Sequence, residues 1–232
     1  MSVKSITSVV ACATVIGALS LTTAAHAQWT VTNLSPAGSA GSAASAASGG
    51  QQVGYAKVGG VSPASLWSGT AASWVDLSPA GSTNSFAWAA RGGQQAWYEG
   101  VGGARRASLW SGTAASWVDL NPAGSTESAA WAVSGGQQAG EAIVGGVTRA
   151  SLWSGTADSW VDLNPAGSTA SAAYAASGGQ QAGYALVGGV TRASLWSGTA
   201  DSWVDLNPQA RRNPSPLVPT AGSRPGSQSW AG

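Results

Sequence analysis

The stretch SLWSGTADSWVDLNPAGSTASAA, from Ser151 to Ala173, decides the fold, because the chain repeats it almost letter for letter. Near copies begin at Ser65, Ser108 and Ser194. The tryptophan of each SLW recurs every 43 residues, at Trp67, Trp110, Trp153 and Trp196. A fixed period of this length is typical of one supersecondary unit that is copied and stacked into an array or a closed ring.

One unit, residues 123–165, divides into four short segments that glycine, serine or proline separates. The segments are Ser128–Ser134, Gln137–Val144, Thr148–Trp153 and Ser159–Leu163. Each is too short for a typical helix and is bounded by strong turn formers, so we predict four β-strands. The alanine-rich first segment also suits a helix, but its length and the flanking Gly pair outweigh that preference.

Four short strands in about 40 to 45 residues is the dimension of a β-propeller blade. We therefore predict an all-β, β-propeller-like fold with four complete four-stranded blades. The repeat domain covers residues 28–208, and its blades are residues 37–79, 80–122, 123–165 and 166–208. A parallel β-helix is the main alternative, but its coils are usually shorter than this unit.

The N-terminus does not follow the repeat. Lys4 precedes an apolar run from Ile6 to Leu21, and Ala25-His26-Ala27 has the pattern of a signal-peptidase site before Gln28. We predict a secretory signal peptide at residues 1–27, hence a secreted protein, extracellular or periplasmic. A membrane anchor would need roughly 20 apolar residues, and the lipobox-like Cys12 stands too early in the run, so we expect no stable membrane insertion after cleavage.

The charges left after this cleavage restrict the function. Of the 10 Lys and Arg residues, cleavage removes Lys4, which leaves nine against nine Asp and Glu, and it also removes the single Met, Cys and His. A disulfide, a Ser/His/Asp or Cys/His nucleophile and the common zinc sites are thereby excluded. A net charge near zero also argues against nucleic acid as a partner. We expect no enzyme, no cofactor and no metal, with a paired-carboxylate glycosidase as a distant alternative.

The order SxAxAxxxGQQxG, then ASLW, then WxDL resembles the HAF-repeat proteins, a group of exported bacterial proteins. The matching stretches here are Ser128–Gly140, Ala150–Trp153 and Trp160–Leu163, repeated across residues 29–208. Two features depart from that pattern, because AS replaces the HAF triplet and the Asn before the GQ is absent. The resemblance implies an exported, propeller-like array and carries no catalytic assignment.

Both ends of the repeat suggest a fifth unit. Shifted by one base, codons for Gln209–Pro214 can encode Ala-Gly-Ser-Thr-Glu-Ser, the residues of Ala123–Ser128. We interpret residues 209–232 as a disordered tail left by a frameshift, and the alternative is a naturally disordered tail.

Residues 28–36 resemble an orphan last strand, with Leu34 in register with Leu77. That strand would complete the fifth blade and close a five-bladed ring. The alternative architectures for the whole repeat are a four-bladed ring, an open solenoid and a larger ring.

Several polar positions recur once per unit. The aspartates before the NP or SP turn are expected to bond turn backbone rather than Ca²⁺ or sugars, and they are Asp76, Asp119, Asp162 and Asp205. The arginines near the third segment are expected to be solvated edge charges, and they are Arg105, Arg106, Arg149 and Arg192.

The 13 tryptophans carry the binding hypothesis. Eight recur in the last two segments of every unit and are expected to pack between blades. Trp88, Trp131 and Tyr174 share a third, variable position, and we single them out as candidate glycan-binding residues. The sequence thus favours a secreted, non-catalytic protein with a structural or interaction role. The alternative is a glycan-binding, lectin-like propeller. The sequence does not identify the partner, and extracellular glycans and proteins are the candidates.

Overall fold

The structure is a computed structural model that describes residues 30–208. The predicted signal peptide at residues 1–27 and the predicted tail at residues 209–232 lie outside the described residues. All strands belong to one compact unit that begins at Thr32. Within the described residues, no helix has both the length and the apolar character needed to cross a membrane.

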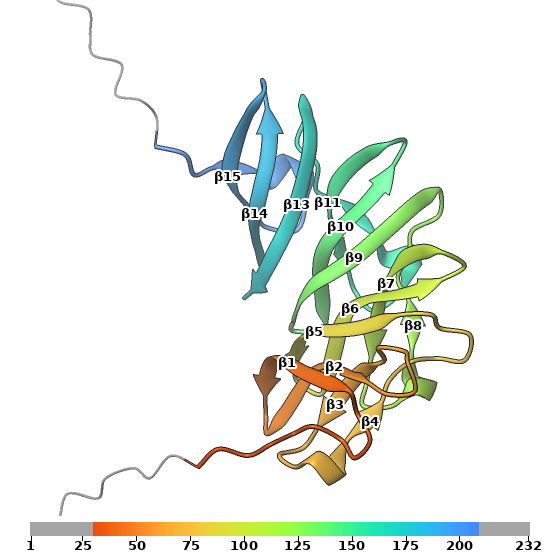
Figure 1. Ribbon diagram of the computed structural model, residues 1–232. Coiled ribbons are helices and arrows are strands. Elements are labelled where there is room, and N and C mark those ends of the chain that lie inside the picture. The colour runs from red at the N-terminus through yellow and green to blue at the C-terminus, as the bar shows by residue number, and fades with distance from the viewer. Residues whose placement is uncertain (1–29, 209–232) are drawn as a thin grey trace, which may run out of the picture. The chain divides into compact units, whose positions relative to one another are not determined.

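The chain forms four antiparallel sheets of four strands each, one for every predicted unit (Figure 1). In each sheet, strands that follow one another in the chain are hydrogen-bonded neighbours. The strands are β1 (Gly41–Ser48), β2 (Gln51–Lys57), β3 (Ala64–Trp67) and β4 (Val75–Asp76) in the first sheet; β5 (Ser85–Arg91), β6 (Gln94–Val101), β7 (Ala104–Trp110) and β8 (Val118–Asp119) in the second; β9 (Ser125–Ser134), β10 (Gln137–Val144), β11 (Val147–Trp153) and β12 (Val161–Asp162) in the third; and β13 (Ser168–Ser177), β14 (Gln180–Val187), β15 (Val190–Trp196) and β16 (Val204–Asp205) in the fourth.

Glycine pairs make the hairpins where the sequence predicts turns. Between β9 and β10, Gly135 and Gly136 have φ values of 59° and 79°. A two-residue hairpin turn of this kind needs positive φ at both central positions, which glycine adopts without steric cost. The pair therefore sets the register of the hairpin.

The fourth strand of each unit is shorter than predicted. In the third unit, a 3₁₀ helix at Ala157–Ser159 (η3) precedes β12, so the predicted start of that strand at Ser159 is wrong. The Ser159 hydroxyl donates to the carbonyl oxygen of Thr156 at 2.6 Å and accepts the backbone N–H of Ser154 at 2.8 Å. These local bonds favour a tight turn over a strand. The same helix recurs as η1 (Ala71–Ser73), η2 (Ala114–Ser116) and η4 (Ala200–Ser202).

The repeated aspartates bond turn backbone, as predicted. Asp162 Oδ1 accepts the N–H of Asn164 at 2.8 Å, and the other three aspartates make the same bond. The prediction that the arginines near the third strand are solvated edge charges is wrong, however. Arg149 Nη1 lies 2.6 Å from Asp162 Oδ2, and Arg106 and Arg192 pair with their own aspartates in the same way. These arginines are half-buried partners of the turn, not free edge charges.

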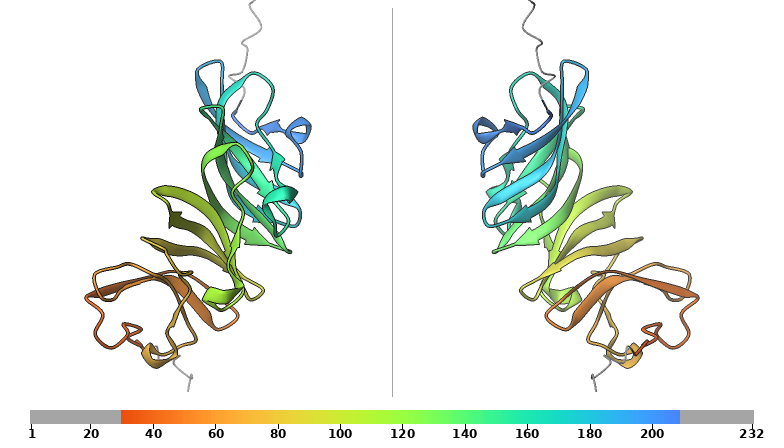
Figure 2. Two further views of the ribbon diagram at one scale, coloured as in Figure 1. Left: turned by 90° about the vertical axis from the view of Figure 1, so that its right-hand side faces the viewer. Right: turned by 90° about the vertical axis from the view of Figure 1, so that its left-hand side faces the viewer.

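Successive sheets pack face to face (Figures 1 and 2). Each junction buries a tryptophan. Between the second and third sheets, Trp153 is 0% exposed and packs with Leu109 and Leu120. Trp110 and Trp196 take this place at the other two junctions. First strands of neighbouring sheets contact one another, whereas no comparable contact joins the fourth strands within the described chain. The sheets thus converge at their alanine-rich first strands, where small side chains fit.

The second recurring tryptophan of each unit is half-buried and hydrogen-bonded. Trp160 Nε1 donates to the hydroxyl of Ser151 at 2.9 Å, and the other units repeat the bond. The prediction that the recurring tryptophans pack between sheets is therefore confirmed at the three junctions, where Trp110, Trp153 and Trp196 are buried and Trp117, Trp160 and Trp203 pack beside them.

A serine joins each sheet to the next one. Ser171 of the fourth sheet accepts the backbone N–H of Ala150 in the third at 2.9 Å, and its hydroxyl donates to Asn164 Oδ1 at 2.6 Å. Ser85 and Ser128 accept the equivalent N–H at the other junctions.

We expect Ser171→Ala to lower the free energy of unfolding by about 1–3 kcal/mol, because the Ala150 N–H is then buried without an acceptor. Urea unfolding measures this loss. Ser177→Ala, at an exposed position of the same strand, is the control and should cost about 0.5 kcal/mol or less. Equal losses in the two variants would contradict the inter-sheet role.

Residues 30–36 form no strand, so the predicted orphan strand at 28–36 is wrong over the described part. A strand needs a hydrogen-bonded partner, and the blade that would supply one is not among the described residues. The turn that ends a blade nevertheless persists. Ser35 N–H donates to Asn33 Oδ1 at 2.9 Å, and the Ser35 hydroxyl lies 2.9 Å from that of Ser42.

Candidate functional site: an aromatic row

The three candidate binding residues all lie at a β-bulge. The pairing between the first two strands skips a residue at the same place in every sheet, and the residues skipped there are Ser45, Trp88, Trp131 and Tyr174. A bulge leaves its extra residue unpaired and redirects the side chain. At this shared bulge position, three of the four sheets carry an aromatic ring.

The residue opposite the bulge is glycine in three sheets. At Gly140 an added Cβ would lie 1.9 Å from the carbonyl oxygen of Ala129, so the approach of the two strands requires glycine there. The second sheet has Trp97 at this position, only 8% exposed. Its ring stacks on Trp88 with centroids 5.1 Å apart and meets Trp131 edge-to-face.

The structure brings the three candidate residues together. Trp88 and Trp131 have ring centroids 6.5 Å apart, and Trp131 and Tyr174 are 5.4 Å apart. Further rings continue the contacts in both directions, through Tyr98 and Phe86 to Tyr55, and through Tyr174 to Tyr184. We call this set the aromatic row; it consists of Tyr55, Phe86, Trp88, Trp97, Tyr98, Trp131, Tyr174 and Tyr184.

The aromatic row is open to solvent at its centre and toward one end. Trp88 is 50% exposed and Tyr174 is 49% exposed, whereas the four SLW tryptophans are at most 1% exposed. Large apolar side chains exposed side by side mark interaction sites more often than isolated ones do. Burial thus divides the tryptophans into two groups, one in the core and one open to solvent.

Charged groups border the aromatic row at the junction of the second and third sheets. Arg105 lies over the ring of Tyr98, 5.8 Å from its centroid, and its Nη2 is 2.7 Å from Glu127 Oε2. Glu141 stands in the third sheet where the other sheets have tyrosine. Burial raises the pKa of Glu141, and nearby Arg105 opposes that rise. Arg105 also bridges two sheets, so its assignment as an edge charge was wrong.

The tyrosines at the far end of the aromatic row stay protonated at neutral pH. Burial raises the pKa of Tyr174 and that of Tyr184, and the negative charge of Glu141 adds to both. Their hydroxyls therefore remain hydrogen-bond donors.

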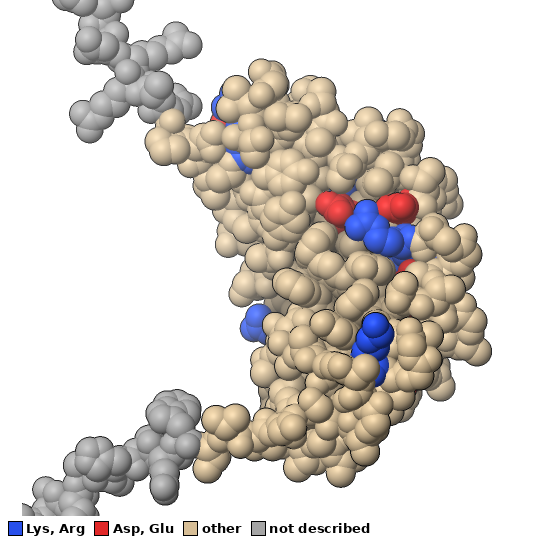
Figure 3. All heavy atoms as spheres, viewed as in Figure 1, with Lys and Arg blue, Asp and Glu red and all other residues tan. Residues whose placement is uncertain are grey.

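A hollow of about 320 Å³ adjoins the aromatic row at Tyr98. Its lining combines that ring with polar groups from the loop before β5 and from β7, and comprises Thr83, Asn84, Tyr98, Gly100, Gly103, Ala104 and Arg105. The face shown in Figure 3 is largely uncharged, with acids and bases gathered in small groups. An aromatic wall with a few convergent polar groups is the usual composition of a small-ligand site.

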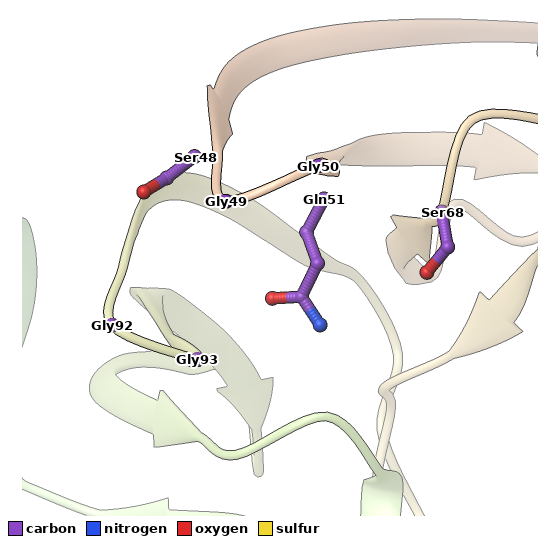
Figure 4. A pocket seen from close by; sticks show the side chains of 7 residues that line it. All are labelled: Ser48, Gly49, Gly50, Gln51, Ser68, Gly92 and Gly93. Atoms are coloured by element: carbon purple, nitrogen blue, oxygen red, sulfur yellow. The ribbon is translucent and has the colours of Figure 1, made fainter.

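A larger hollow, of about 450 Å³, lies elsewhere, between the glycine turns of the first two sheets (Figure 4). Gln51 and the hydroxyls of Ser48 and Ser68 supply its only polar side chains. It has no acid, base or aromatic ring among its lining residues, so it offers little for catalysis or stacking.

The carboxylate of Glu99, which does not belong to the aromatic row, is fully buried. Glu99 is 0% exposed and accepts a hydrogen bond from Ser82. Burial raises its pKa from 4.5 to about 7. The other sheets have alanine at this position, so Glu99 is particular to the second sheet. Over residues 30–208, no three His, Cys, Asp or Glu side chains gather as a metal site.

Comparison with known proteins addresses the fold. No protein-family model and no curated protein matches the chain. A solved structure, that of a puromycin hydrolase mutant complexed with PGG, is similar over 68% of this chain, with a TM-score of 0.53 and 15% identity. The matched part of puromycin hydrolase is a β-propeller. This chain has a β-propeller-like fold.

The propeller-like fold confirms the prediction from the repeat. A second puromycin hydrolase structure gives a TM-score of 0.48 at 13% identity. This chain spans 27% of the hydrolase chain, and at such low identity the similarity concerns the fold alone. The site must therefore be interpreted from its own residues.

Proposed function

We propose that this propeller-like protein is an exported, non-catalytic binding protein whose aromatic row holds uncharged, extended glycans. The observation that carries the proposal is the exposure of Trp88 and Tyr174 in one continuous line of rings with Trp131. Exposed, clustered rings favour the lectin-like alternative over a purely structural role, since packing alone does not require them.

Sugar rings suit this surface for two reasons. Their C–H faces are apolar and pack against aromatic faces, and their hydroxyls need hydrogen-bond partners at the edge. Arg105, Glu127 and Asn84 supply such partners beside Tyr98. The ligand should be uncharged, because Arg105 is paired with Glu127 and Glu141 stands beside them, so this small mixed group favours neither a polyanion nor a polycation.

The aromatic row also crosses all four sheets, from Tyr55 on β2 to Tyr184 on β14. Several weak contacts along one extended glycan raise the overall affinity beyond that of a single ring. The signal-peptide pattern at residues 1–27 and the resemblance to HAF-repeat proteins support export, where such glycans occur.

Titration of the protein with a panel of soluble neutral oligosaccharides, including β-1,4-linked glucose and N-acetylglucosamine oligomers, tests the proposal. We expect at least one class to change tryptophan fluorescence in a saturable way, with longer oligomers binding more tightly. No response to any sugar in the panel would count against glycan binding and favour a structural role.

The paired variant Trp88→Ala with Trp131→Ala should weaken that binding at least tenfold, measured by calorimetry because the variant loses fluorophores. Truncating a central aromatic residue of a binding site usually weakens the binding free energy by about 2 kcal/mol or more. A loss of about 1.4 kcal/mol corresponds to a tenfold weaker affinity. Val190→Ala, at a position 49% exposed and outside the aromatic row, is the matched control and should bind like the parent. Unchanged binding in the double variant would place the glycan site elsewhere.

A further inference from the structure

The fourth sheet exposes the residues that the other sheets bury. Leu206 is 51% exposed, whereas Leu77, Leu120 and Leu163 at the same position are 0% exposed. The sequence from Ala193 to Pro208 is identical to that from Ala150 to Pro165, so the neighbouring sheet alone makes the difference. We call this side of a sheet its forward face, and in the fourth sheet it comprises Ala175, Ala182, Ala193, Leu195, Val204 and Leu206.

The forward face of the fourth sheet is apolar and hollowed. Val204 is 49% exposed, and a hollow of about 170 Å³ has Ala182 and Leu195 in its lining. At the three interior junctions the next sheet fills the equivalent space with its tryptophan and small residues.

The first sheet carries the complementary side. At interior junctions the later sheet contributes, on what we call its rear face, the positions that correspond in the first sheet to Ala44, Ala47, Ala56, Val58, Trp67 and Trp74. Ala44 is exposed in the first sheet, although its equivalents Ala87, Ala130 and Ala173 are 0% exposed. Ala56 and Trp67 on the same rear face are 0% and 1% exposed, so the first sheet is open at Ala44 and not over the whole face. The residues of both sides of the repeated interface are therefore present in one chain, at its opposite ends.

Each end also holds half of the serine bond that joins interior sheets. The N–H of Ala193 has no following serine and donates to Asn207 Oδ1 at 2.9 Å. Ser42, which corresponds to Ser85, Ser128 and Ser171, lies 2.9 Å from the Ser35 hydroxyl, just as Ser85 contacts Ser78 at the first interior junction, but within the described residues no N–H of a preceding sheet reaches it. A forward face from a preceding copy would supply that N–H, and its turn at Asn207 would displace the turn at Ser35.

The chain's own first sheet does not fill this space. Within the described residues, the first and fourth sheets share neither a paired strand nor a hydrophobic cluster.

We propose that copies of this protein associate head to tail, with the forward face of the fourth sheet of one copy on the rear face of the first sheet of the next. The interface repeats the three that already exist within the chain, which is the reason to choose a second copy as the occupant. It is heterologous, so a closed ring or a filament results according to the rotation between copies. Association also brings Tyr184 of one copy beside the sheet that bears Tyr55 of the next and extends the aromatic row.

Light scattering after size-exclusion chromatography, at micromolar concentrations of the exported chain, tests this interface. We expect a mass of two copies or more. Leu206→Asp, on the forward face, and Ala44→Asp, on the rear face, should each reduce the mass to one copy. Val190→Asp matches Leu206 in exposure but lies outside both faces, and it should keep the parent mass.

Mixing the two monomeric variants distinguishes head-to-tail contact from any symmetric one. Each variant retains the face that the other lacks, so the mixture should form a complex of one copy of each and nothing larger. A monomeric parent protein would overturn the proposal. That holds whether the forward face is then covered by the chain's own first sheet, by its tail or by nothing. A mixture that stays monomeric, or a Val190→Asp variant that dissociates equally, would overturn it too. None of these outcomes bears on glycan binding, which the titration measures separately.

Discussion

Replacing Trp153 by alanine is expected to lower the free energy of unfolding by about 3–5 kcal/mol, the usual cost of truncating a large aromatic residue in a core. Trp153 is 0% exposed and fills the junction between the second and third sheets against Leu109 and Leu120. The cavity left behind cannot collapse easily, because hydrogen-bonded strands of two sheets form its walls. Urea unfolding followed by circular dichroism measures the loss.

The matched variant is Trp88→Ala, which removes the same side chain from a position that is 50% exposed. It should cost about 1 kcal/mol, the value of its stacking on Trp97. It should also impair glycan binding. Comparable losses of stability in the two variants would contradict the division between packing and binding tryptophans.

Glu99→Gln is expected to remove a pH dependence of stability. Burial raises the pKa of Glu99 from 4.5 to about 7, so the folded protein holds a proton that the unfolded chain releases at lower pH. The contribution of Glu99 to the free energy of unfolding should therefore be fully present below about pH 4.5. It should be lost as the pH rises through 7.

A shift of this size corresponds to at most about 3 kcal/mol, and we expect about 2 kcal/mol after screening by nearby solvent. Unfolding free energies at pH 5 and pH 8 measure it. Glutamine keeps the shape without the charge, so the variant should show little difference between the two pH values and should exceed the parent in stability at pH 8. The control Glu127→Gln changes a half-exposed acid and should retain the pH dependence. A parent protein more stable at pH 8 than at pH 5 would contradict this account of Glu99.

Local signals in the sequence predicted the blades well. The second strand of the third unit was predicted at Gln137–Val144, and β10 has these bounds, because glycine pairs at both ends define the turns. The fourth strand was predicted too long, since Ser159 bonds its own turn through its side chain, a competition that strand periodicity does not reveal. The orphan strand failed at residues 30–36 because strand pairing depends on a partner that sequence similarity to Leu77 could not supply.

The candidate site was predicted only in part. The 43-residue period placed Trp88, Trp131 and Tyr174 at one position of the unit, and the structure brings their rings together. The sequence did not indicate Trp97, which replaces a glycine of the other units, nor the tyrosines and Phe86 that extend the aromatic row. Those contacts depend on the bulge and on packing between sheets. Arg105 was misassigned for a similar reason, since its partner Glu127 is contributed by the next sheet.

The central claim is that the aromatic row binds glycan while the recurring tryptophans hold the sheets together, and the indole N–H resonances of ¹⁵N-labelled protein test it most directly. On addition of a binding oligosaccharide identified by the titration, the resonances of Trp88, Trp97 and Trp131 should shift. Those of Trp74, Trp117, Trp160 and Trp203, which donate to serine, should stay in place. Shifts confined to this second group, or no shift in the first with any glycan tested, would contradict the claim.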